Sequence, residues 1–283
     1  MLLPLLLSGG VAGLAQAATP AMAARKPEEQ QAAAALAPAE PVSPWYWDGE
    51  RARVFAAGRV GLGASANAEL DLGYGKPFWL WAGFQGWGVA TSESAMASVG
   101  WKLGLPIFEL TGGYRIVVPF QRGRLSKQER YVSDDLAHAD AEPYAALDCD
   151  AIGYVPLPHF VLVPEAGFHF VGARRAALYE EEQRVIMNGP WLWYGKLSAL
   201  VTWGDARRFR LGPMVEYFAS SRALSTVRLG PAFSVGFTPH LDALAYATLP
   251  VSGPDSLSFY DGMGGSLSLR YRWASDERER SFP

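Results

Sequence analysis

Side-chain character alternates with a period of two along most of the chain between Ala52 and Trp273. In the segment Ala66–Tyr74, one set of alternate residues is Ala, Ala, Leu, Leu and Tyr, and the other is Asn, Glu, Asp and Gly. Successive side chains of a β-strand point to opposite faces of the sheet, so this segment has one apolar and one polar surface. The pattern therefore predicts an all-β protein whose strands each have two unlike faces.

Twelve segments fit a β-strand. They are Arg51–Gly63, Ala66–Tyr74, Phe78–Val89, Ala97–Leu105, Phe108–Val118, Ala145–Val155, Phe160–Phe170, Trp193–Trp203, Phe209–Tyr217, Val227–Phe237, Leu241–Leu249 and Gly265–Trp273. The segment Phe78–Val89 is an exception to the alternation, because aromatic residues occupy both of its faces. An even number of strands suits a closed barrel whose two chain ends lie in one compartment.

Soluble sheets alternate too, but with the apolar face inward, and two features favour a membrane barrel over a β-sandwich or a lipocalin-like barrel. Every second connection is brief, whereas Pro119–Glu142 and Gly172–Pro190 in the other register are long and charged. Aromatic residues such as Trp101, Trp203 and Trp273 gather near strand ends, as they do at membrane interfaces. We therefore expect a closed antiparallel transmembrane β-barrel of about twelve strands, with short periplasmic turns and longer extracellular loops.

The two ends of the chain differ in composition from the barrel segment. Residues 1–23 are uncharged, begin with an apolar run and end in small residues. A signal peptide is expected there, although its usual basic start is missing and an uncleaved anchor is the alternative. Residues 24–44 are rich in Ala, Pro and Glu and are expected to form a flexible periplasmic arm. The barrel is expected over 45–273, and a charged tail over 274–283.

The last strand segment, Gly265–Trp273, has hydrophobic residues at alternate positions and ends on an aromatic residue. In this it resembles the terminal strand of bacterial outer-membrane β-barrel proteins, although ten residues follow the closing Trp273. The resemblance implies that the barrel-assembly machinery recognises this strand and that the protein resides in the outer membrane. Membrane lipids and lipopolysaccharide are then its expected surroundings, and its loops, arm and tail offer surfaces to further envelope proteins.

With the apolar faces turned outward, the polar faces line the lumen. The residues expected there are Arg51, Arg53, Arg59, Glu69, Asp71, Lys102, Glu109, Arg115, Asp148, Asp150, Glu165, His169, Lys196, Arg210, Glu216, Arg228, Asp242, Arg270 and Arg272. The ten cations and eight anions nearly cancel, and ionic groups in a narrow interior must pair. The main interpretation is a salt-bridge-filled barrel that serves as a structural anchor or interaction component of the envelope, as part of an envelope-spanning machine.

A narrow porin-like channel is the alternative, because a barrel of about twelve strands lies between a filled barrel and an open porin. Closure of the barrel would bring Arg51, Arg53 and Arg59 on the first strand beside Arg270 and Arg272 on the last. These residues would form a basic stripe on one wall, which would attract anionic solutes.

An outer-membrane lipid hydrolase is the third hypothesis, and it needs a nucleophile within hydrogen-bond reach of a base. His169, with Glu165 on the same strand face, is the candidate base, but no nucleophile motif surrounds it. Cys149 is the only cysteine, so no intramolecular disulfide and no cysteine metal cluster is expected. The net charge of −3 gives no reason to expect nucleic acid. We predict no catalytic residue, no metal and no cofactor.

Overall fold

The computed structural model describes residues 52–63, 65–76, 80–172, 177–204, 208–220, 225–238, 240–255 and 257–274. All of them belong to the second of two structural units in the chain, Val42–Pro283. The predicted signal peptide, the predicted arm, Arg51 and residues 275–283 of the predicted tail lie outside the described residues.

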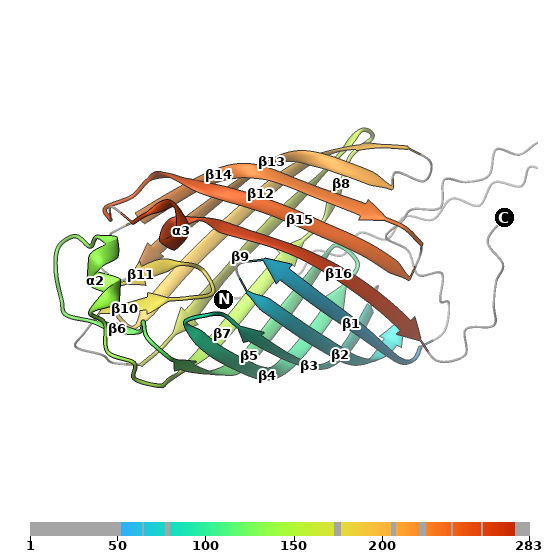
Figure 1. Cartoon of the computed structure of the whole chain (residues 1–283). Helices are drawn as coiled ribbons and strands as arrows, with labels where there is room; N and C mark the ends of the chain where they lie inside the picture. Colours follow the sequence, from blue (N-terminus) through green and yellow to red (C-terminus); the bar gives the residue numbers. More distant parts are fainter. Residues whose placement is uncertain are drawn as a thin grey trace, which may run out of the picture. The chain divides into compact units, whose positions relative to one another are not determined.

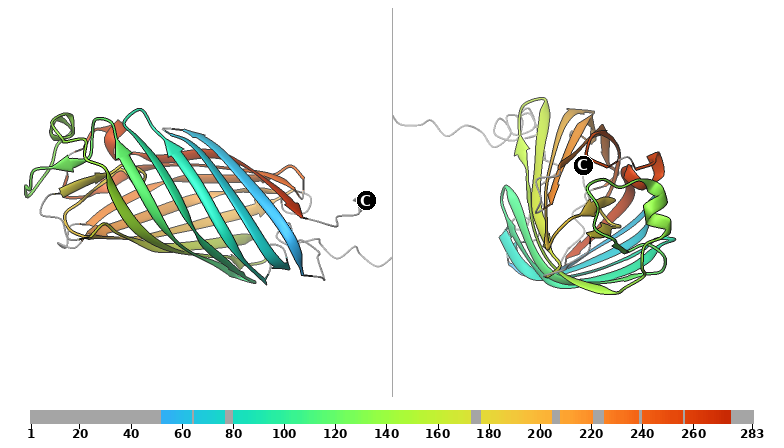
Figure 2. Two further views of the ribbon diagram at one scale, coloured as in Figure 1. Left: turned by 90° about the horizontal axis from the view of Figure 1, so that it is seen from below. Right: turned by 90° about the vertical axis from the view of Figure 1, so that its left-hand side faces the viewer.

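Twelve long antiparallel strands form a closed ring (Figures 1 and 2). They are β1 (Arg53–Gly63), β2 (Ala66–Lys76), β3 (Leu80–Ala90), β4 (Ser94–Leu105), β5 (Phe108–Pro119), β7 (Tyr144–Gly153), β9 (Phe160–Phe170), β12 (Trp191–Trp203), β13 (Phe209–Ser220), β14 (Ser225–Gly236), β15 (Leu241–Ser252) and β16 (Gly264–Ala274). Each strand pairs with the next in this order, and the pairing of β16 with β1 closes the ring. A short extra strand, β8 (Val155–Pro156), pairs with β9.

The two faces of the ring follow the alternation in the sequence. On β2, Leu70 and Leu72 are each 51% exposed on the outer face, whereas Asp71 between them is buried on the inner face. The same outward exposure recurs around the ring, for example at Val60 of β1 and Trp193 of β12. An apolar outer wall without open strand edges is the arrangement that lipid requires, and each of the twelve strands here pairs with a neighbour on both sides.

All twelve predicted strands are confirmed, with ends that differ by no more than three residues from the predicted ones. Strand β3, which did not alternate, points Trp81 inward and Phe84 outward. The Trp81 ring packs edge-on against Phe55 at 4.8 Å between centroids. It lies so close to Gly104 that a Cβ there would come within 2.0 Å of the indole nitrogen. A large inward ring is therefore accommodated because a glycine faces it on the next strand.

The two ends of the ring differ in their connections. One end, here called the turn end, carries the connections 77–79, 106–107, 154–159, 204–208 and 237–240. The opposite end, here called the loop end, carries the connections 120–143, 171–190 and 253–263 as well as three short ones. This asymmetry confirms the predicted division into short turns and long loops.

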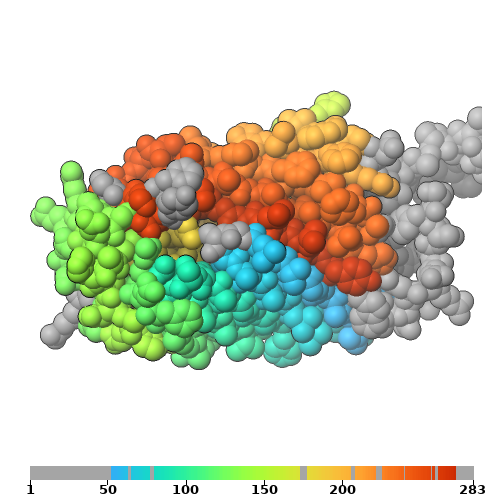
Figure 3. All heavy atoms as spheres, viewed as in Figure 1, coloured from blue at the N-terminus to red at the C-terminus, as the bar shows by residue number. Residues whose placement is uncertain are grey.

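The three long connections contain secondary structure of their own. The first holds β6 (Arg124–Leu125) and α2 (Ser133–Ala137), the second holds β10 (Ala177–Glu180) and β11 (Val185–Met187), and the third holds α3 (Phe259–Gly262). Strands β11, β10 and β6 form a small separate sheet in that order. None of the described helices is long and apolar enough to span a membrane. In Figure 3 the green connection between β5 and β7 covers the loop end of the barrel.

Candidate functional site

The hairpin formed by β10, residues 181–184 and β11 lies inside the ring at the loop end (Figure 2, right). Every residue of both of its strands is buried. Leu178, Val185 and Met187 of the hairpin belong to one apolar cluster with inward side chains of β4, β5, β7, β12 and β13, among them Val117 and Phe218. The hairpin is therefore packed against the inner wall and does not extend into the solvent beyond the barrel.

Arg115 of β5 holds the hairpin from one side. Its side chain is 0% exposed, and its Nη1 donates to Glu180 Oε1 at 2.9 Å and to Glu182 Oε2 at 2.6 Å. Its Nε lies 3.1 Å from Asp148 Oδ2 on the neighbouring strand, and its guanidinium lies over the ring of Trp87. The wall thus fixes the direction of this arginine, and the hairpin supplies two more carboxylates to it.

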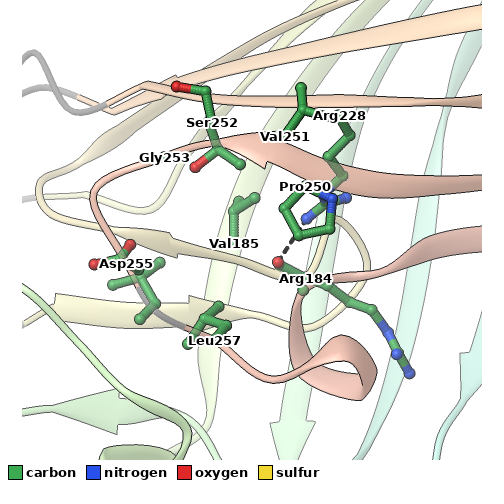
Figure 4. Close-up of a pocket in the computed structure, with 12 residues that line it drawn as sticks. Arg184, Val185, Arg228, Pro250, Val251, Ser252, Gly253, Asp255 and Leu257 are labelled. Carbon is green, nitrogen blue, oxygen red and sulfur yellow. Dashed lines mark hydrogen bonds between the residues drawn. The ribbon is translucent and has the colours of Figure 1, made fainter.

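Arg228 of β14 holds the hairpin from the other side. Its Nη2 donates to the backbone oxygens of Gln183 and Arg184 at 2.7 and 2.6 Å, and Figure 4 shows the bond to Arg184. The wall positions Arg228 through Glu216, at 3.6 Å, and through the ring of Phe218, whose centroid lies 4.7 Å from the guanidinium carbon.

These two contacts come from nearly opposite walls. Around the ring, β5 and β14 are separated by four strands in one direction and by six in the other. A barrel of twelve strands tilted by about 40° has a backbone diameter of roughly 24 Å. Two arginine side chains and a two-stranded hairpin occupy most of this width. The hairpin therefore spans the lumen near the loop end.

A cavity of about 280 Å³ remains between the hairpin and the wall of β14 and β15 (Figure 4). Its lining includes the backbone of the hairpin at Arg184 and Val185, the polar Thr226 and Ser252, and Asp255 of the third long connection. This cavity is the space that the hairpin leaves open on one side.

The three long connections are bonded to one another above the hairpin. Tyr179 Oη donates to the backbone oxygen of Asp261 at 2.6 Å, and Tyr131 Oη donates to Asn188 Oδ1 at 3.1 Å. The Tyr131 backbone nitrogen donates to Asp255 Oδ1 at 3.1 Å, and Arg122 pairs with Asp261. A second apolar cluster lies beneath these bonds, formed by Leu125, Tyr131, Leu136, Ala177, Tyr179 and Ile186. We call the first and third of these connections, residues 120–143 and 253–263, the cap.

Glu181 is a buried carboxyl group at the tip of the hairpin. Its Oε1 has no hydrogen-bond partner within the described part of the chain. Burial, together with the charge of Glu180, raises the pKa of Glu181 to about 7. The seated hairpin therefore favours the protonated form of this side chain.

The half of the lumen nearer the turn end is here called the turn half. Among the described residues it contains ion pairs between wall strands and no inserted segment. Lys102 lies 2.9 Å from Asp71 Oδ2, 3.3 Å from Glu69 Oε1 and 3.6 Å from Glu109 Oε2. Arg59 pairs with Glu69 at 3.2 Å. One cation thus serves three carboxylates from β2 and β5, as expected for charges in a confined interior.

The basic stripe is present in position but not in charge. Arg59 and Arg270 are direct partners in the register of β1 and β16. Arg270, however, pairs with Asp242 at 3.0 Å, and Arg59 pairs with Glu69. Both of these arginines are therefore neighbours, and each is paired with a carboxylate. Arg51 lies outside the described residues, as does the side chain of Arg272.

Water reaches the inward side chains of the turn half. The guanidinium-bearing side chain of Arg59 is 34% exposed, although its strand face points into the ring. Leu244 shares the inward register of Asp242 and is 37% exposed. An inward-facing leucine with this exposure marks an unfilled interior. The half of the lumen nearer the loop end is here called the loop half. It differs from the turn half because its inward apolar residues are buried against the hairpin.

The remaining predicted lumen residues also lie on inward registers. Lys196 lies 3.2 Å from Glu165 and 3.9 Å from Glu216, and Tyr194 donates to Asp150. Arg210 is buried, and Arg53 is partly buried. The residues that the prediction missed are those of the hairpin, Glu180 to Arg184, which complete the ionic contacts of the loop half.

The enzymatic hypothesis placed His169 beside Glu165, and that pairing is wrong. His169 Nδ1 bonds to Asp148 Oδ1 at 2.7 Å, and the imidazole stacks on Tyr194. Its Nε2 is buried without a hydrogen-bond partner among the described residues. The sequence spacing suggested Glu165 because it lies on the same strand, whereas the partner comes from β7 across the sheet. Within the described ranges, no group of three or more His, Cys, Asp or Glu residues is arranged to hold a metal ion.

Comparison with known proteins gives weak likenesses only. No protein-family model matches the chain, and no curated protein matches it in sequence. The KdgM porin in complex with disordered oligogalacturonate is similar over 77% of this chain and 98% of its own, with 8% identity and a TM-score of 0.39. The NanC porin is similar over 78% of this chain and 98% of its own, with 8% identity and a TM-score of 0.36. The β domain of the Bordetella autotransporter BrkA covers the same shares with 12% identity and a TM-score of 0.41.

Since all three TM-scores are below 0.5, the assignment rests on the molecule itself. A closed ring of antiparallel strands carries an apolar outer wall and ion pairs within, and both its first and its last strand meet the turn end. The protein is a bacterial outer-membrane β-barrel. In outer-membrane barrels the short turns lie at the periplasmic end and the long loops at the extracellular end, which correspond here to the turn end and the loop end.

Proposed function

We propose that this barrel is a porin-like channel for small hydrophilic solutes and that the seated hairpin closes its outer mouth. The observation that carries the proposal is the exposure of Leu244 and Arg59 within the turn half. A barrel that serves only as an anchor gains nothing from an inward leucine in contact with water, because filling that space would add packing energy.

The hairpin can leave the lumen without disrupting the barrel wall. The hairpin belongs to one connection, and guanidinium bonds and apolar contacts hold it in the ring. Withdrawing it breaks no pairing between wall strands, since it pairs with β6 of the cap and with itself alone. The wall therefore stays closed whether the hairpin is seated or released.

Single-channel recording in planar bilayers tests this function. We expect small or rare conductance from the full chain, and a large steady conductance when residues 177–187 are replaced by a Gly-Ser linker of equal length. The control is a variant in which the five exposed residues 126–130 of the cap are replaced by a Gly-Ser linker of equal length. If the hairpin replacement folds as a heat-modifiable barrel and conducts no better than this control, the lumen is closed elsewhere and the anchoring role is the better account.

A further inference from the structure

We infer that Arg115 and Arg228 form a binding site for a solute with several carboxylates, and that the acidic tip of the hairpin, residues 179–184, occupies this site as an internal substitute for the ligand. The inference rests on the proposed function, since it names the solute class that would open the channel. The tip reads Tyr-Glu-Glu-Glu-Gln-Arg, and three consecutive carboxylates inside a barrel call for an explanation.

Both arginines are held by the wall, independently of the hairpin. Asp148 and the ring of Trp87 position Arg115, and Glu216 and the ring of Phe218 position Arg228. A cation on an aromatic face with a fixed carboxylate behind it keeps its direction when the front partner leaves. The site is thus preorganised, which lowers the entropy lost when a ligand binds.

Both arginines also retain donor capacity that the hairpin does not use. Within the described residues, Nη2 of Arg115 and Nε of Arg228 are buried without a hydrogen-bond partner. The bonds that Arg228 makes to the tip go to neutral backbone oxygens of Gln183 and Arg184. A carboxylate would accept from the same nitrogens with roughly twice the strength of a neutral acceptor. A ligand with well-spaced carboxylates can therefore compete with the tip.

The required spacing follows from the tip itself. Arg115 contacts Glu180 and Glu182, and Arg228 contacts the next two residues along the chain. Because Glu180 and Val185 are partners across the hairpin, the tip folds back on itself, and the two guanidiniums contact different parts of a chain two strands wide. The ligand class is accordingly an oligomeric or extended polycarboxylate, because a single carboxylate would reach only one guanidinium.

The tip is also poorly accommodated where it lies. The side chain of Glu181 is buried next to that of Glu180, and one of its oxygens is unpaired within the described part of the chain. A buried carboxylate beside another of the same sign opposes seating of the hairpin. A ligand that places its charges only at the two guanidiniums avoids this cost.

The hexapeptide with the sequence of residues 179–184 is the probe, and a version with Gln at all three Glu positions is its match without side-chain carboxylates. We expect the fluorescently labelled acidic peptide to bind the full-length protein, and to bind the variant Glu180→Gln/Glu182→Gln on the order of tenfold more tightly, since the internal competitor is weakened. Adding Arg115→Gln or Arg228→Gln to that variant should lower the affinity by about tenfold or more. Arg59→Gln in the turn half is the matched control and should leave the affinity unchanged.

A second assay measures release of the tip as the rate of trypsin cleavage after Arg184. The acidic peptide should increase this rate, and the peptide with three Gln should leave it unchanged. Equal binding of both peptides, or acidic-peptide binding that Arg115→Gln and Arg228→Gln leave unchanged, overturns the inference. Neither measurement uses conductance. If the barrel binds the peptide at these arginines but never conducts, the proposed channel is refuted and the proposed binding site is retained. If the barrel conducts but does not bind the peptide, the binding site is refuted and the channel is retained.

Discussion

The loop half and the turn half of the lumen are built from the same alternating strands, yet one is dry and the other is wet. In the loop half, Arg115 is fully buried, and Val117 and Phe218 pack against the hairpin, which belongs to a connection and not to a wall strand. In the turn half, Arg59 and Leu244 point into the same ring and remain in contact with water. The difference teaches that the strands determine which residues face inward, whereas a connection determines whether that interior is filled.

Removing Arg115 should separate the two halves most sharply. Arg115→Ala leaves the fully buried Glu180 without its cation, and the loss of one partner of a buried pair costs about 3–5 kcal/mol. We expect amide hydrogens of residues 177–187 to lose their protection against exchange. Arg270→Ala in the turn half, whose ion pair is partly exposed, should leave that protection unchanged. Equal loss in both variants would contradict a division of the lumen into two halves.

The next comparison is between two leucines in the lumen, Leu178 of the hairpin and Leu244 of the wall. Leu178→Ala removes a side chain packed between the hairpin and the wall and should weaken hairpin seating by about 2–4 kcal/mol. Leu244→Ala removes a side chain that water already contacts, and should change stability by no more than about 1 kcal/mol. Urea unfolding in lipid vesicles, followed together with hydrogen exchange of the hairpin, measures both. Comparable costs would show that the turn half is filled as well.

The turn half has a tight point of its own at Trp81. Gly104→Ala would place a Cβ within 2.0 Å of the indole nitrogen and should destabilise the barrel by about 1–3 kcal/mol. Gly86→Ala is the matched control, because its added Cβ would meet its nearest neighbour at 3.9 Å. The urea midpoint should fall in the first variant only, and hairpin protection should persist in both.

Acidity gives the smallest effect, and it acts on the loop half alone. The pKa of Glu181 rises from 4.5 to about 7 in the seated hairpin, so seating is favoured most below pH 4.5 and weakens as the pH rises towards 7. The charged groups that act on Glu181 are Glu180 and Arg184 of the hairpin, Glu93 of the β3–β4 turn, and Arg122 of the cap. We expect trypsin cleavage after Arg184, divided at each pH by the rate of trypsin on a short peptide substrate, to increase by on the order of tenfold between pH 5.5 and pH 8.

Glu181→Gln, which cannot titrate, should reduce this increase. Because the pKa of Glu182 is also raised to about 7 by burial, the variant Glu181→Gln/Glu182→Gln is needed to abolish most of it. A pH dependence that survives both substitutions would assign the effect to another group in the cap.

The wall could be predicted from sequence because each strand carries its own signal. Leu70, Asp71 and Leu72 lie between lipid and lumen whatever the rest of the chain does, so a local pattern suffices. The inward course of Trp81 was not predicted because it depends on Gly104 of the next strand. The pairing of His169 with Asp148 was missed for the same reason, since it crosses from β9 to β7.

The hairpin was not predicted, and the reason is separation along the chain. Arg115 and Glu180 are 65 positions apart, and the sequence of a charged loop does not indicate whether it turns inward or outward. A weak signal was present, because the uncharged run Val185-Ile186-Met187 is unusual for an exposed loop. Recognising it required the knowledge that inward residues such as Val117 and Phe218 lacked a partner across the lumen.

The cap draws on the connection that precedes the final strand, and this sets an order of events during biogenesis. Asp255 and Asp261 reach the other two connections from the β15–β16 segment, and β16 is also the strand that completes the ring with β1. A nascent barrel that has not yet received its last strand keeps the contacts between the first two connections but lacks those of the third. The contacts at the loop end are therefore complete only after the ring has closed.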